Sequence, residues 1–368
     1  MLNSEKIKSA LLALGEAQLA AKECFGGAMA VMSDGETVIN ECFGDERFNE
    51  RSIFRLASVT KLFTAAAVVK LHSENKIDIY SPVSRYLPDF GYIQLGNLTA
   101  DGRVYSMGLP RREITLFDLL THTAGLGAGE LGSREYTVMR PEYKQSLEIA
   151  CDYYAKNAHL AFEPGSRAAY SGFAGYDVLA RVIEVVLNKS FNDYLTEEFF
   201  VPLGMGDTTF QPTEEQYNRI VPMHKRISGE DREIDFKGTL FRGLPRTYEA
   251  AGAALVSSMR DILTFCRMLL SGGGDILTKD AVDMMLSPKL DSGLPGLEKG
   301  ENNCFGCFIA EEGHRLPKGT VLCHGAYGTH VLLKPEEKFA AVFLKNSMYD
   351  MTNPSASTIA FEKAVLQK

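Results

Sequence analysis

The stretch Phe54-Arg55-Leu56-Ala57-Ser58-Val59-Thr60-Lys61 decides how this chain is interpreted. It opens a segment, from Ser58 to about Glu74, that carries apolar residues on nearly every side of a helix, and such a helix is buried. Because residues i and i+3 share a helix face, Lys61 lies within reach of the Ser58 hydroxyl. A serine needs a neighbour to take its proton, and a lysine amine desolvated by an apolar helix wall can be that base. The stretch therefore predicts a nucleophilic Ser58, with helix-start N–H groups nearby that suit a developing oxyanion.

The same spacing of serine and lysine occurs a second time, at Ser73-Glu74-Asn75-Lys76, so the spacing alone is weak evidence. We interpret this second copy as the solvated last turn of the helix, with Lys76 near the negative end of the helix dipole. For Ser58 the alternative is a simple N-cap with a neighbouring surface lysine. Residues elsewhere in the chain must decide between the two interpretations.

Further stretches accompany the first one in a fixed order along the chain. They are Tyr80-Ser81-Pro82-Val83-Ser84-Arg85-Tyr86-Leu87-Pro88, Ile114-Thr115-Leu116-Phe117-Asp118-Leu119-Leu120-Thr121-His122-Thr123-Ala124-Gly125-Leu126, Pro164-Gly165, Tyr170-Ser171, residues 177–184, Pro202-Leu203-Gly204-Met205 and residues 251–258. Together, from about residue 45 to 346, they resemble the serine β-lactamase and penicillin-binding-protein-like superfamily. Within it, the chain looks most like the class C-related branch that includes family VIII carboxylesterases.

The resemblance implies an acyl-enzyme mechanism, with Ser58 and Lys61 as catalytic residues and Tyr170 in the place of the family's second-motif tyrosine. A phenol near a lysine can be held as phenolate or can relay a proton to the leaving group. The alternative for Tyr170 is a packed core tyrosine beside Tyr176. The family's motif often reads Tyr-x-Asn, whereas this chain has Tyr170-Ser171-Gly172. The missing amide puts lactam recognition in doubt and affects ester turnover less.

The family's third motif, a Lys-Thr-Gly or a variant with His or Trp, falls in the stretch from Cys323 to Thr329. Aligning the glycine puts Cys323-His324-Gly325 on the motif, and a shift by one puts His324 first but Ala326 where the glycine belongs. We prefer the first register. In either one, we expect the backbone N–H of Ala326 or a neighbour to complete an oxyanion hole with that of Ser58. The alternative for His324 is a satisfied core histidine.

Four other patterns are interpreted as structural. Cys304-Phe305-Gly306-Cys307 is a lone CxxC whose side chains would face opposite ways in a strand, so we expect seven free thiols and no zinc or redox role. Residues 127–132 match G-x-G-x-x-G but do not follow a strand, which argues against a nucleotide. His122 we take as structural. His324 and His330 lack a carboxylate at metal spacing, so we expect no metal and no cofactor.

Strand-like patterns lie towards both ends of the chain, and helical patterns fill the middle. Expected helices are 4–22 with Ser4 as cap, 116–120, 146–154, 176–187, 258–270 and 355–366; expected strands are 28–32, 37–40 and runs around 304–310, 319–323 and 338–345. We predict an α/β (α+β) fold with an antiparallel sheet flanked by helices, formed from both chain ends, as in the β-lactamase/transpeptidase-like fold. Residues 1–78 and 250–368 would form this domain, and residues 79–249 would form a mainly helical inserted domain with few strands. The active site would lie at the interface between the two domains.

Composition restricts the partners. The 368 residues are 45% hydrophobic and 23% charged, as in globular proteins, and the net charge of -8 opposes nucleic acids and anionic membranes. No run approaches the roughly 18 to 20 apolar residues that span a bilayer, and the start of the chain lacks a signal pattern, so we expect a cytoplasmic location.

The function predicted from these patterns is a serine hydrolase, most simply a carboxylesterase acting on a small-molecule ester or amide. The first alternative is a β-lactamase, D,D-peptidase or D-aminopeptidase, and the second is a non-catalytic binding homologue. A transacylase would use the same residues with an alcohol in place of water. We expect the substrate walls in residues 90–112 and 211–247, where the resemblance is thinnest.

Overall fold

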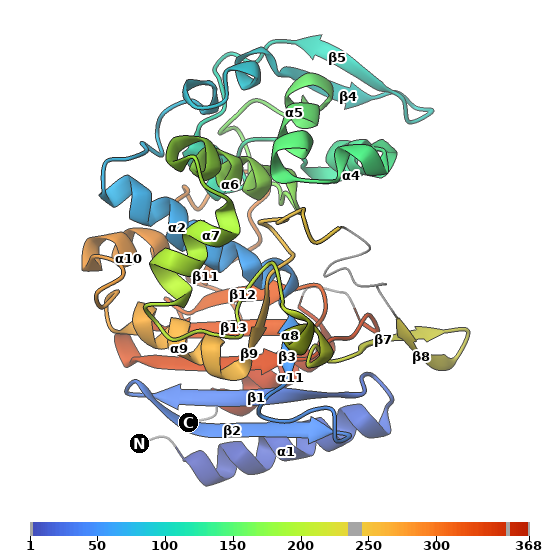
Figure 1. Ribbon diagram of the computed structural model, residues 1–368, viewed down its shortest axis with the longest axis vertical. Coiled ribbons are helices and arrows are strands. Elements are labelled where there is room, and N and C mark those ends of the chain that lie inside the picture. The colour runs from blue at the N-terminus through green and yellow to red at the C-terminus, as the bar shows by residue number, and fades with distance from the viewer. Residues whose placement is uncertain (1–2, 235–244, 351–353, 367–368) are drawn as a thin grey trace.

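The computed structural model describes residues 3–234, 245–350 and 354–366, and its centre is a large antiparallel sheet. Within the described residues the sheet has seven strands in the order β10-β11-β12-β13-β14-β1-β2 (Figure 1). The strands are β1 (Gly26–Ser33), β2 (Glu36–Gly44), β10 (Glu301–Cys304), β11 (Cys307–Ala310), β12 (Val321–Gly325), β13 (Thr329–Lys334) and β14 (Phe339–Leu344). Strand β1 pairs with β14, with Ala28 opposite Leu344. The prediction that both chain ends form one antiparallel sheet is therefore confirmed.

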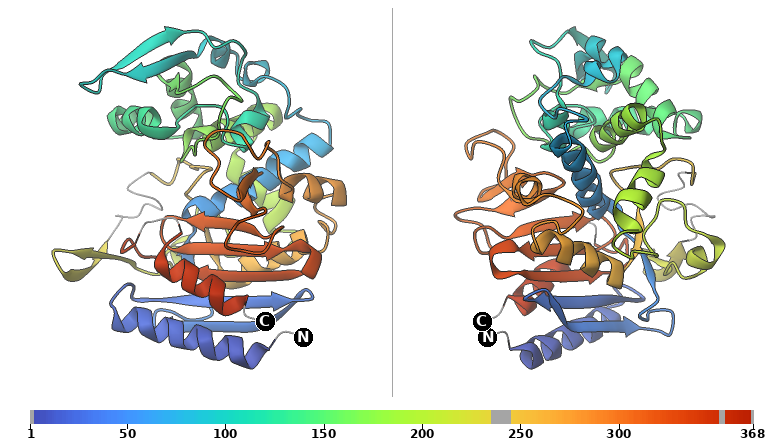
Figure 2. Two further views of the ribbon diagram at one scale, coloured as in Figure 1. Left: turned by 180° about the vertical axis from the view of Figure 1, so that it is seen from behind. Right: turned by 60° about the vertical axis from the view of Figure 1, so that its left-hand side comes forward.

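Helices cover both faces of the sheet, so β1 is buried on both of its sides. Met29 and Val31 face the helices α1 (Ser4–Ala20) and α11 (Ala356–Val365), which pack side by side. Ala28 and Ala30 face the opposite core, which includes α9 (Met259–Leu270) and α10 (Lys279–Leu286). The alternation follows from the two-residue period of a strand. Figure 2 shows α1 and α11 as the outer layer at the foot of the molecule.

The predicted first helix is present, but its cap is not Ser4. Asn3 is the N-cap, and its side chain accepts a hydrogen bond from the Lys6 N–H. Ser4 is the first helical residue. Asparagine and serine serve equally well at this position, so the sequence pattern left a shift of one residue open.

The predicted buried helix is α2 (Thr60–Ser73), which runs through the middle of the molecule (Figure 1). Eleven of its fourteen residues are buried. A short 3-10 turn, Ala57–Val59, precedes it and carries Ser58. The second serine–lysine copy lies at the exposed end of α2, where the Ser73 hydroxyl donates to the Lys70 carbonyl and Lys76 pairs with Glu74.

The middle of the chain contains more strands than predicted. Its helices are α3 (Leu116–Leu120), α4 (Gly129–Val138), α5 (Leu147–Asn157), α6 (Ala174–Leu187), α7 (Phe191–Leu195) and α8 (Glu214–Asn218). Its strands are β4 (Gln94–Leu98), β5 (Val104–Gly108), β6 (His159–Leu160), β7 (Met223–Ile227) and β8 (Glu230–Ile234). These hairpins lie at the surface with exposed residues on both faces of β5, so they lack the alternation that marks a half-buried strand. The division at residues 79 and 249 stays a prediction.

The last part of the sheet also differs from the prediction of three short runs. Residues 304–310 span the last residue of β10, a turn and β11, and the CxxC forms this hairpin turn, with Cys304 opposite Cys307. Partners across a hairpin project to the same face, so the expectation that these side chains face opposite ways is wrong. Strand β13 was not predicted, because its first five residues are all buried and show no alternation.

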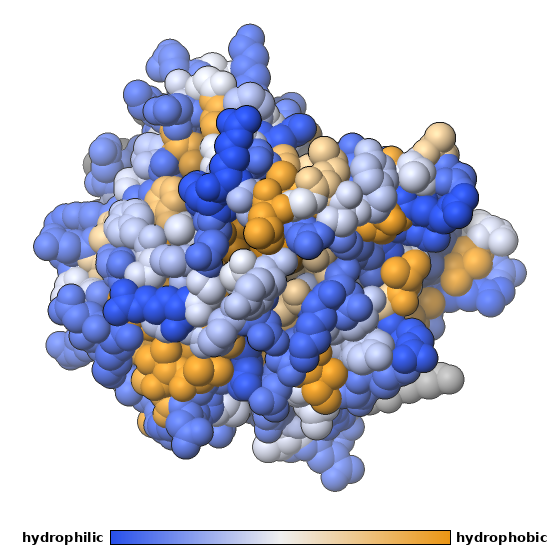
Figure 3. All heavy atoms as spheres, turned by 90° about the horizontal axis from the view of Figure 1, so that it is seen from above, coloured by the Kyte–Doolittle hydropathy of each residue, from blue (hydrophilic) through white to orange (hydrophobic). Residues whose placement is uncertain are grey.

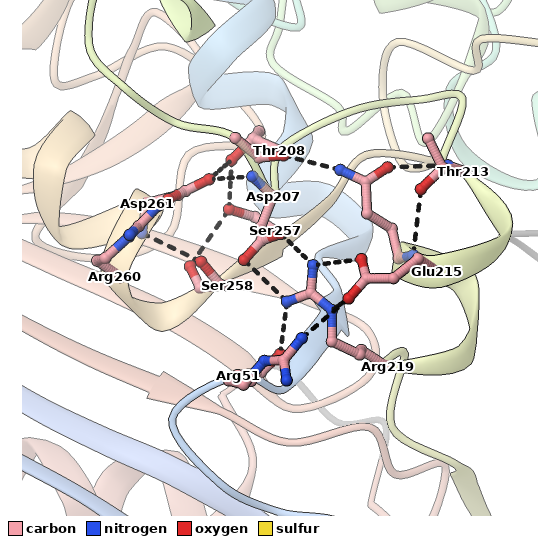
Figure 4. A network of polar contacts seen from close by, with 12 residues as sticks. Arg51, Asp207, Thr208, Thr213, Glu215, Arg219, Ser257, Ser258, Arg260 and Asp261 are labelled. Carbon is pink, nitrogen blue, oxygen red and sulfur yellow. Dashed lines mark hydrogen bonds and ion pairs between the residues drawn. The ribbon is translucent and has the colours of Figure 1, made fainter.

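A buried polar network holds the segment that leads into the Ser58 turn. Strand β3 (Ile53–Arg55) pairs with β9 (Val256–Ser258), and β9 continues into α9. The buried Asp261 of α9 accepts hydrogen bonds from the Asp207 N–H (2.7 Å) and the Thr208 hydroxyl (3.0 Å). Asp207 in turn pairs with Arg219 (Figure 4). The network fixes β9, and β9 fixes the strand before Ser58.

Seen from above, the molecule is mainly hydrophilic, with apolar side chains in separate patches (Figure 3). Tyr92 (77% exposed) and Leu109 (62%) belong to the segments around the β4–β5 hairpin. Scattered exposed apolar residues are usual on folded proteins. Among the described helices, none is long and apolar enough to cross a membrane.

Candidate active site

Ser58 lies in the sharp turn between β3 and α2. Ala57, in the same turn, has a positive φ of 48°, which is rare for a residue with a side chain. The N-cap of α2 is Val59, and no side chain caps the helix. The alternative interpretation of Ser58 as an N-cap is therefore wrong, and its hydroxyl is available at the wall of a cavity.

The structure brings the three predicted catalytic side chains together. The Tyr170 hydroxyl donates to Ser58 Oγ over 2.7 Å, although 112 positions separate the two residues. Lys61 Nζ lies 3.5 Å from the same oxygen. The Ser58 hydroxyl thus lies within hydrogen-bond distance of two titratable side chains on different elements.

Lys61 is only 1% exposed, and two backbone carbonyls hold it. Its Nζ donates to the oxygens of Gly172 and Gly252, each over 2.8 Å. The rings of Tyr170 and Tyr176 lie 4.9 and 5.2 Å from the same nitrogen. With two N–H groups bound to carbonyls, the remaining position of Nζ faces Ser58. It presents a lone pair when the amine is neutral and a third N–H when it is protonated.

His122 supports the segment that carries Tyr170. Its ring lies 4.6 Å from the Tyr170 ring, and its Nδ1 accepts a hydrogen bond from the Ser171 N–H (3.2 Å). Burial, together with the positive charge of Lys61, lowers the pKa of His122 to about 3. The ring is therefore neutral at pH 7 and cannot donate a second charge to the site. These contacts fit the structural role expected for His122.

The third-motif residues divide between the two sides of β12. The Cys323 thiol is buried behind the Ser58 turn, 3.9 Å from the Ser58 carbonyl oxygen and 3.5 Å from that of Gly306. His324, Gly325 and Ala326 line the cavity beside Ser58. A Cβ on Gly325 would lie 2.4 Å from the Leu56 carbonyl oxygen, so the strand approaches the Ser58 turn at a distance that only glycine permits. The register of the motif stays a prediction.

His324 belongs to a network that the sequence did not predict. Its ring stacks on that of His330 with a centroid distance of 4.3 Å and an angle of 7°. Glu362, from α11, lies 3.3 Å from His330 Nε2 and supplies the carboxylate that residue spacing did not reveal. A metal ion bound by both rings would have to lie in both ring planes, and parallel planes do not permit that. Arg315 also pairs with Glu362 over 2.8 Å, so we interpret the cluster as a polar network.

The cavity beside Ser58 has a volume of about 700 Å³. Besides Ser58 and Tyr170, its lining includes His122, Ala168, Ala169, Gly296, Leu297, Glu298, Lys299, Glu301, Asn303, Phe308, His314, Arg315, Asp350, Pro354, Ser355 and Thr358. Residues 90–112, all of which the structure describes, do not line it, so that expected wall is wrong. The described residues of the second expected wall, 211–234 and 245–247, do not line the cavity either, and residues 235–244 lie outside the described part of the chain.

Comparisons with known proteins bear on the family and the fold of this chain. The family model described as Beta-lactamase matches residues 13–364. The D-alanyl-D-alanine-carboxypeptidase/endopeptidase AmpH of Escherichia coli K12 is 30% identical over 208 residues, which are 55% of this chain and 50% of AmpH. The chain therefore spans about half the length of that relative. Esterase EstB of Burkholderia gladioli is 25% identical over 99% of this chain and 96% of EstB. The structure of EstCE1, a hydrolase with promiscuous acyltransferase activity, superposes with a TM-score of 0.83 at 22% identity, covering 99% of each chain.

Proposed function

Because this chain belongs to the beta-lactamase family of serine hydrolases, we propose that it cleaves small carboxylic esters through an acyl-enzyme on Ser58. The observation that carries the proposal is the contact of the Ser58 hydroxyl with Tyr170 at 2.7 Å and Lys61 at 3.5 Å. The contact lies at a cavity large enough for a small ester. A non-catalytic binding homologue has no need of three groups aligned in this way.

In the proposed acylation, the Ser58 oxygen forms a bond to the ester carbonyl carbon while its proton passes to the Lys61–Tyr170 pair. The negative charge on the former carbonyl oxygen would be held by the backbone N–H groups of Ser58 and Ala326. The close packing of Gly325 on the Leu56 carbonyl supports this pairing, because it holds β12 against the Ser58 turn. As the C–O bond of the ester breaks, Tyr170 returns the proton to the departing alcohol oxygen.

Deacylation would reverse the roles, with water in place of the alcohol. The 43% exposure of Tyr170 places its phenol within reach of water from the cavity. Tyr170 takes a proton from that water while the water oxygen attacks the acyl carbon, and the ester bond to Ser58 breaks. The proton returns to the Ser58 oxygen, which restores the enzyme and releases a carboxylic acid.

Two features bear on the substrate class. Gly172 has no side-chain amide, and its carbonyl is already bound to Lys61, so this position offers no hydrogen-bonding group to the amide of a lactam antibiotic or peptide. EstB, an esterase by name, aligns along nearly the whole chain. The second candidate is a D-alanyl peptidase, which the 30% identity to AmpH favours.

We also propose that the site lies between two domains, one of residues 1–78 and 250–368 and the other of residues 79–249. The segments that carry Ser58, Lys61 and Gly325 come from the first, and Tyr170 comes from the second. A site between domains allows each to contribute a wall of the cavity.

Labelling with a fluorophosphonate followed by mass spectrometry tests the nucleophile. We expect one adduct, on Ser58, and loss of ester turnover in Ser58→Ala. Ser73→Ala is the matched control, because Ser73 has the same spacing to a lysine at the exposed end of α2 and should keep full activity. An adduct elsewhere, or unchanged turnover in Ser58→Ala, would refute the proposal.

A substrate panel separates the candidates. We expect p-nitrophenyl esters of short acids to be hydrolysed faster than nitrocefin and faster than a peptide ending in D-alanyl-D-alanine. Preferred release of D-alanine would replace the esterase assignment with the peptidase.

A further inference from the structure

Lys61 is a buried amine whose direct partners are neutral. Two carbonyl oxygens, a hydroxyl and two aromatic rings surround its Nζ. Among the residues that the structure describes, no carboxylate forms an ion pair with it. A buried ammonium group without a counter-charge is costly, so a nearby negative charge is needed wherever Lys61 carries its proton.

Asp177 is a fully buried carboxylate in the first turn of α6, a helix that contacts α2. Its Oδ2 accepts hydrogen bonds from the hydroxyls of Tyr248 (2.6 Å) and Tyr154 (3.4 Å), and its Oδ1 accepts from the Ala251 N–H (3.0 Å). Burial raises the pKa of Asp177 to about 7, and the positive charge of Lys61 opposes that rise. The two charges therefore interact through the protein interior.

The backbone between Tyr248 and Gly252 connects the two groups. The Tyr248 hydroxyl and the Ala251 N–H of this segment donate hydrogen bonds to Asp177 and hold the segment against it. On its other side the Ala251 carbonyl accepts from the Thr64 hydroxyl of α2 over 2.7 Å. The next carbonyl, that of Gly252, accepts from Lys61. The position of this Lys61 ligand thus depends on the anchor at Asp177.

We propose that Asp177 is the positioning residue of Lys61: its carboxylate balances the Lys61 charge and, through Ala251, fixes the Gly252 carbonyl that holds the amine. The inference rests on the proposed role of Lys61 in proton transfer. Asp177 contacts neither the nucleophile nor the cavity, so it acts only through Lys61 and the 248–252 backbone.

The other titratable groups near Asp177 keep their protons at neutral pH. Burial raises the pKa of Tyr154, Tyr248 and Cys151 well above their ordinary values. Of the groups that face Asp177 from α2, α5 and the 248–252 backbone, these three are therefore uncharged at neutral pH, and Lys61 supplies the opposing charge. A pH dependence near pH 7 that Asp177→Asn removes therefore reports on the Asp177 carboxylate.

Glu249 provides a matched control on the same backbone segment. Its carboxylate is also buried, and burial raises its pKa to about 7 as well. It accepts hydrogen bonds from the Asn192 N–H (2.7 Å) and from the Gln211 side chain (2.6 Å), away from Lys61. Asp177→Asn and Glu249→Gln each remove one buried negative charge, but only the first removes it from beside Lys61.

The decisive experiment is a double-mutant cycle on the full chain, read by denaturant unfolding and therefore independent of any activity. It combines Asp177→Asn with Lys61→Met. We expect the effects of the two substitutions on the unfolding equilibrium constant to be non-additive by about tenfold, because Asp177→Asn leaves an unbalanced charge only where Lys61 is present. Glu249→Gln with Lys61→Met should be additive. Additivity in the Asp177 cycle would overturn the inference, whether or not the protein hydrolyses esters.

Activity gives a second and separable readout. In the pH profile of kcat/KM for a p-nitrophenyl ester, the wild type should lose activity as the pH falls through about 7, where Asp177 binds a proton, and Asp177→Asn should lack this step. The reason is that only the charged carboxylate balances Lys61. The profile of Glu249→Gln should coincide with that of the wild type. An Asp177→Asn profile that coincides with the wild type would refute the inference while leaving the proposed function intact.

Discussion

Replacement of Gly252 by alanine adds one methyl group and tests whether the Gly252 and Gly172 carbonyls position Lys61. A Cβ at this position would lie 2.7 Å from the Gly172 oxygen and 3.0 Å from Lys61 Nζ. Ordinary contacts of carbon begin at about 3.5 Å, so the Lys61 nitrogen must retreat by roughly 0.5 Å and the Gly172 carbonyl by more. Both move away from the positions that hold Lys61 at 3.5 Å from the Ser58 oxygen.

The expected cost follows from the hydrogen bonds involved. Weakening one bond to a buried charged group costs about 1.5 to 3 kcal/mol, which corresponds to a kcat/KM lower by roughly 10- to 150-fold. The methyl group adds little conformational strain, because the φ of Gly252 is not in the left-handed region. The contact with the Gly172 backbone oxygen also costs stability, so kcat/KM is compared at a temperature well below the thermal midpoint of the variant.

The assay is hydrolysis of a p-nitrophenyl ester over a range of concentrations, together with the thermal midpoint of each variant. Gly206→Ala is the control, because a Cβ there meets no atom within 4 Å. Its kcat/KM should equal that of the wild type. If Gly252→Ala also keeps the wild-type kcat/KM, the Gly252 carbonyl does not position Lys61 for proton transfer.

Three further predictions concern other groups. Tyr170→Phe should lower kcat by about 100- to 10,000-fold with a smaller change in KM, because it removes the phenol that lies 2.7 Å from Ser58; a kcat within tenfold of the wild type contradicts the proton-transfer role. The pKa of Glu249 is raised from 4.5 to about 7, so the folded state binds the proton more tightly and the stability contribution of Glu249 is lost as pH rises from about 4.5 through 7. Denaturant titrations should show the free energy of unfolding of the wild type falling by up to about 3 kcal/mol relative to that of Glu249→Gln over that pH range. A difference between the two proteins that does not change with pH would contradict this prediction. Six of the seven cysteines are buried and Cys42 is partly exposed, so an aromatic disulfide reagent should titrate about one thiol in the native protein and all seven after unfolding.

Several features could be predicted because they depend on neighbours in the sequence. The approach of Lys61 to Ser58 follows from the i, i+3 spacing, and the burial of α2 follows from its apolar residues on every side. Apolar runs near both chain ends predicted the central sheet. The hairpins β4–β5 and β7–β8 were not predicted. Strand β5 is exposed on both faces and β7 begins with two consecutive buried residues, so neither strand alternates buried and exposed residues.

Other features required the folded chain. The carbonyls that hold Lys61 come from Gly172 and Gly252, which are 111 and 191 positions away. Every residue has a backbone carbonyl, so the residue type does not indicate which carbonyls bind Lys61. The carboxylate beside His330 belongs to Glu362 on α11, 32 positions further along the chain, so the spacing of residues in the sequence does not predict this contact.

By itself, then, the sequence determined which serine and lysine share a helix face, because that geometry repeats every turn. Only the tertiary structure decided what surrounds the pair: Tyr170 across the cavity, two carbonyls around the amine, and Asp177 behind them. These contacts join segments that meet through packing, and packing depends on the whole chain.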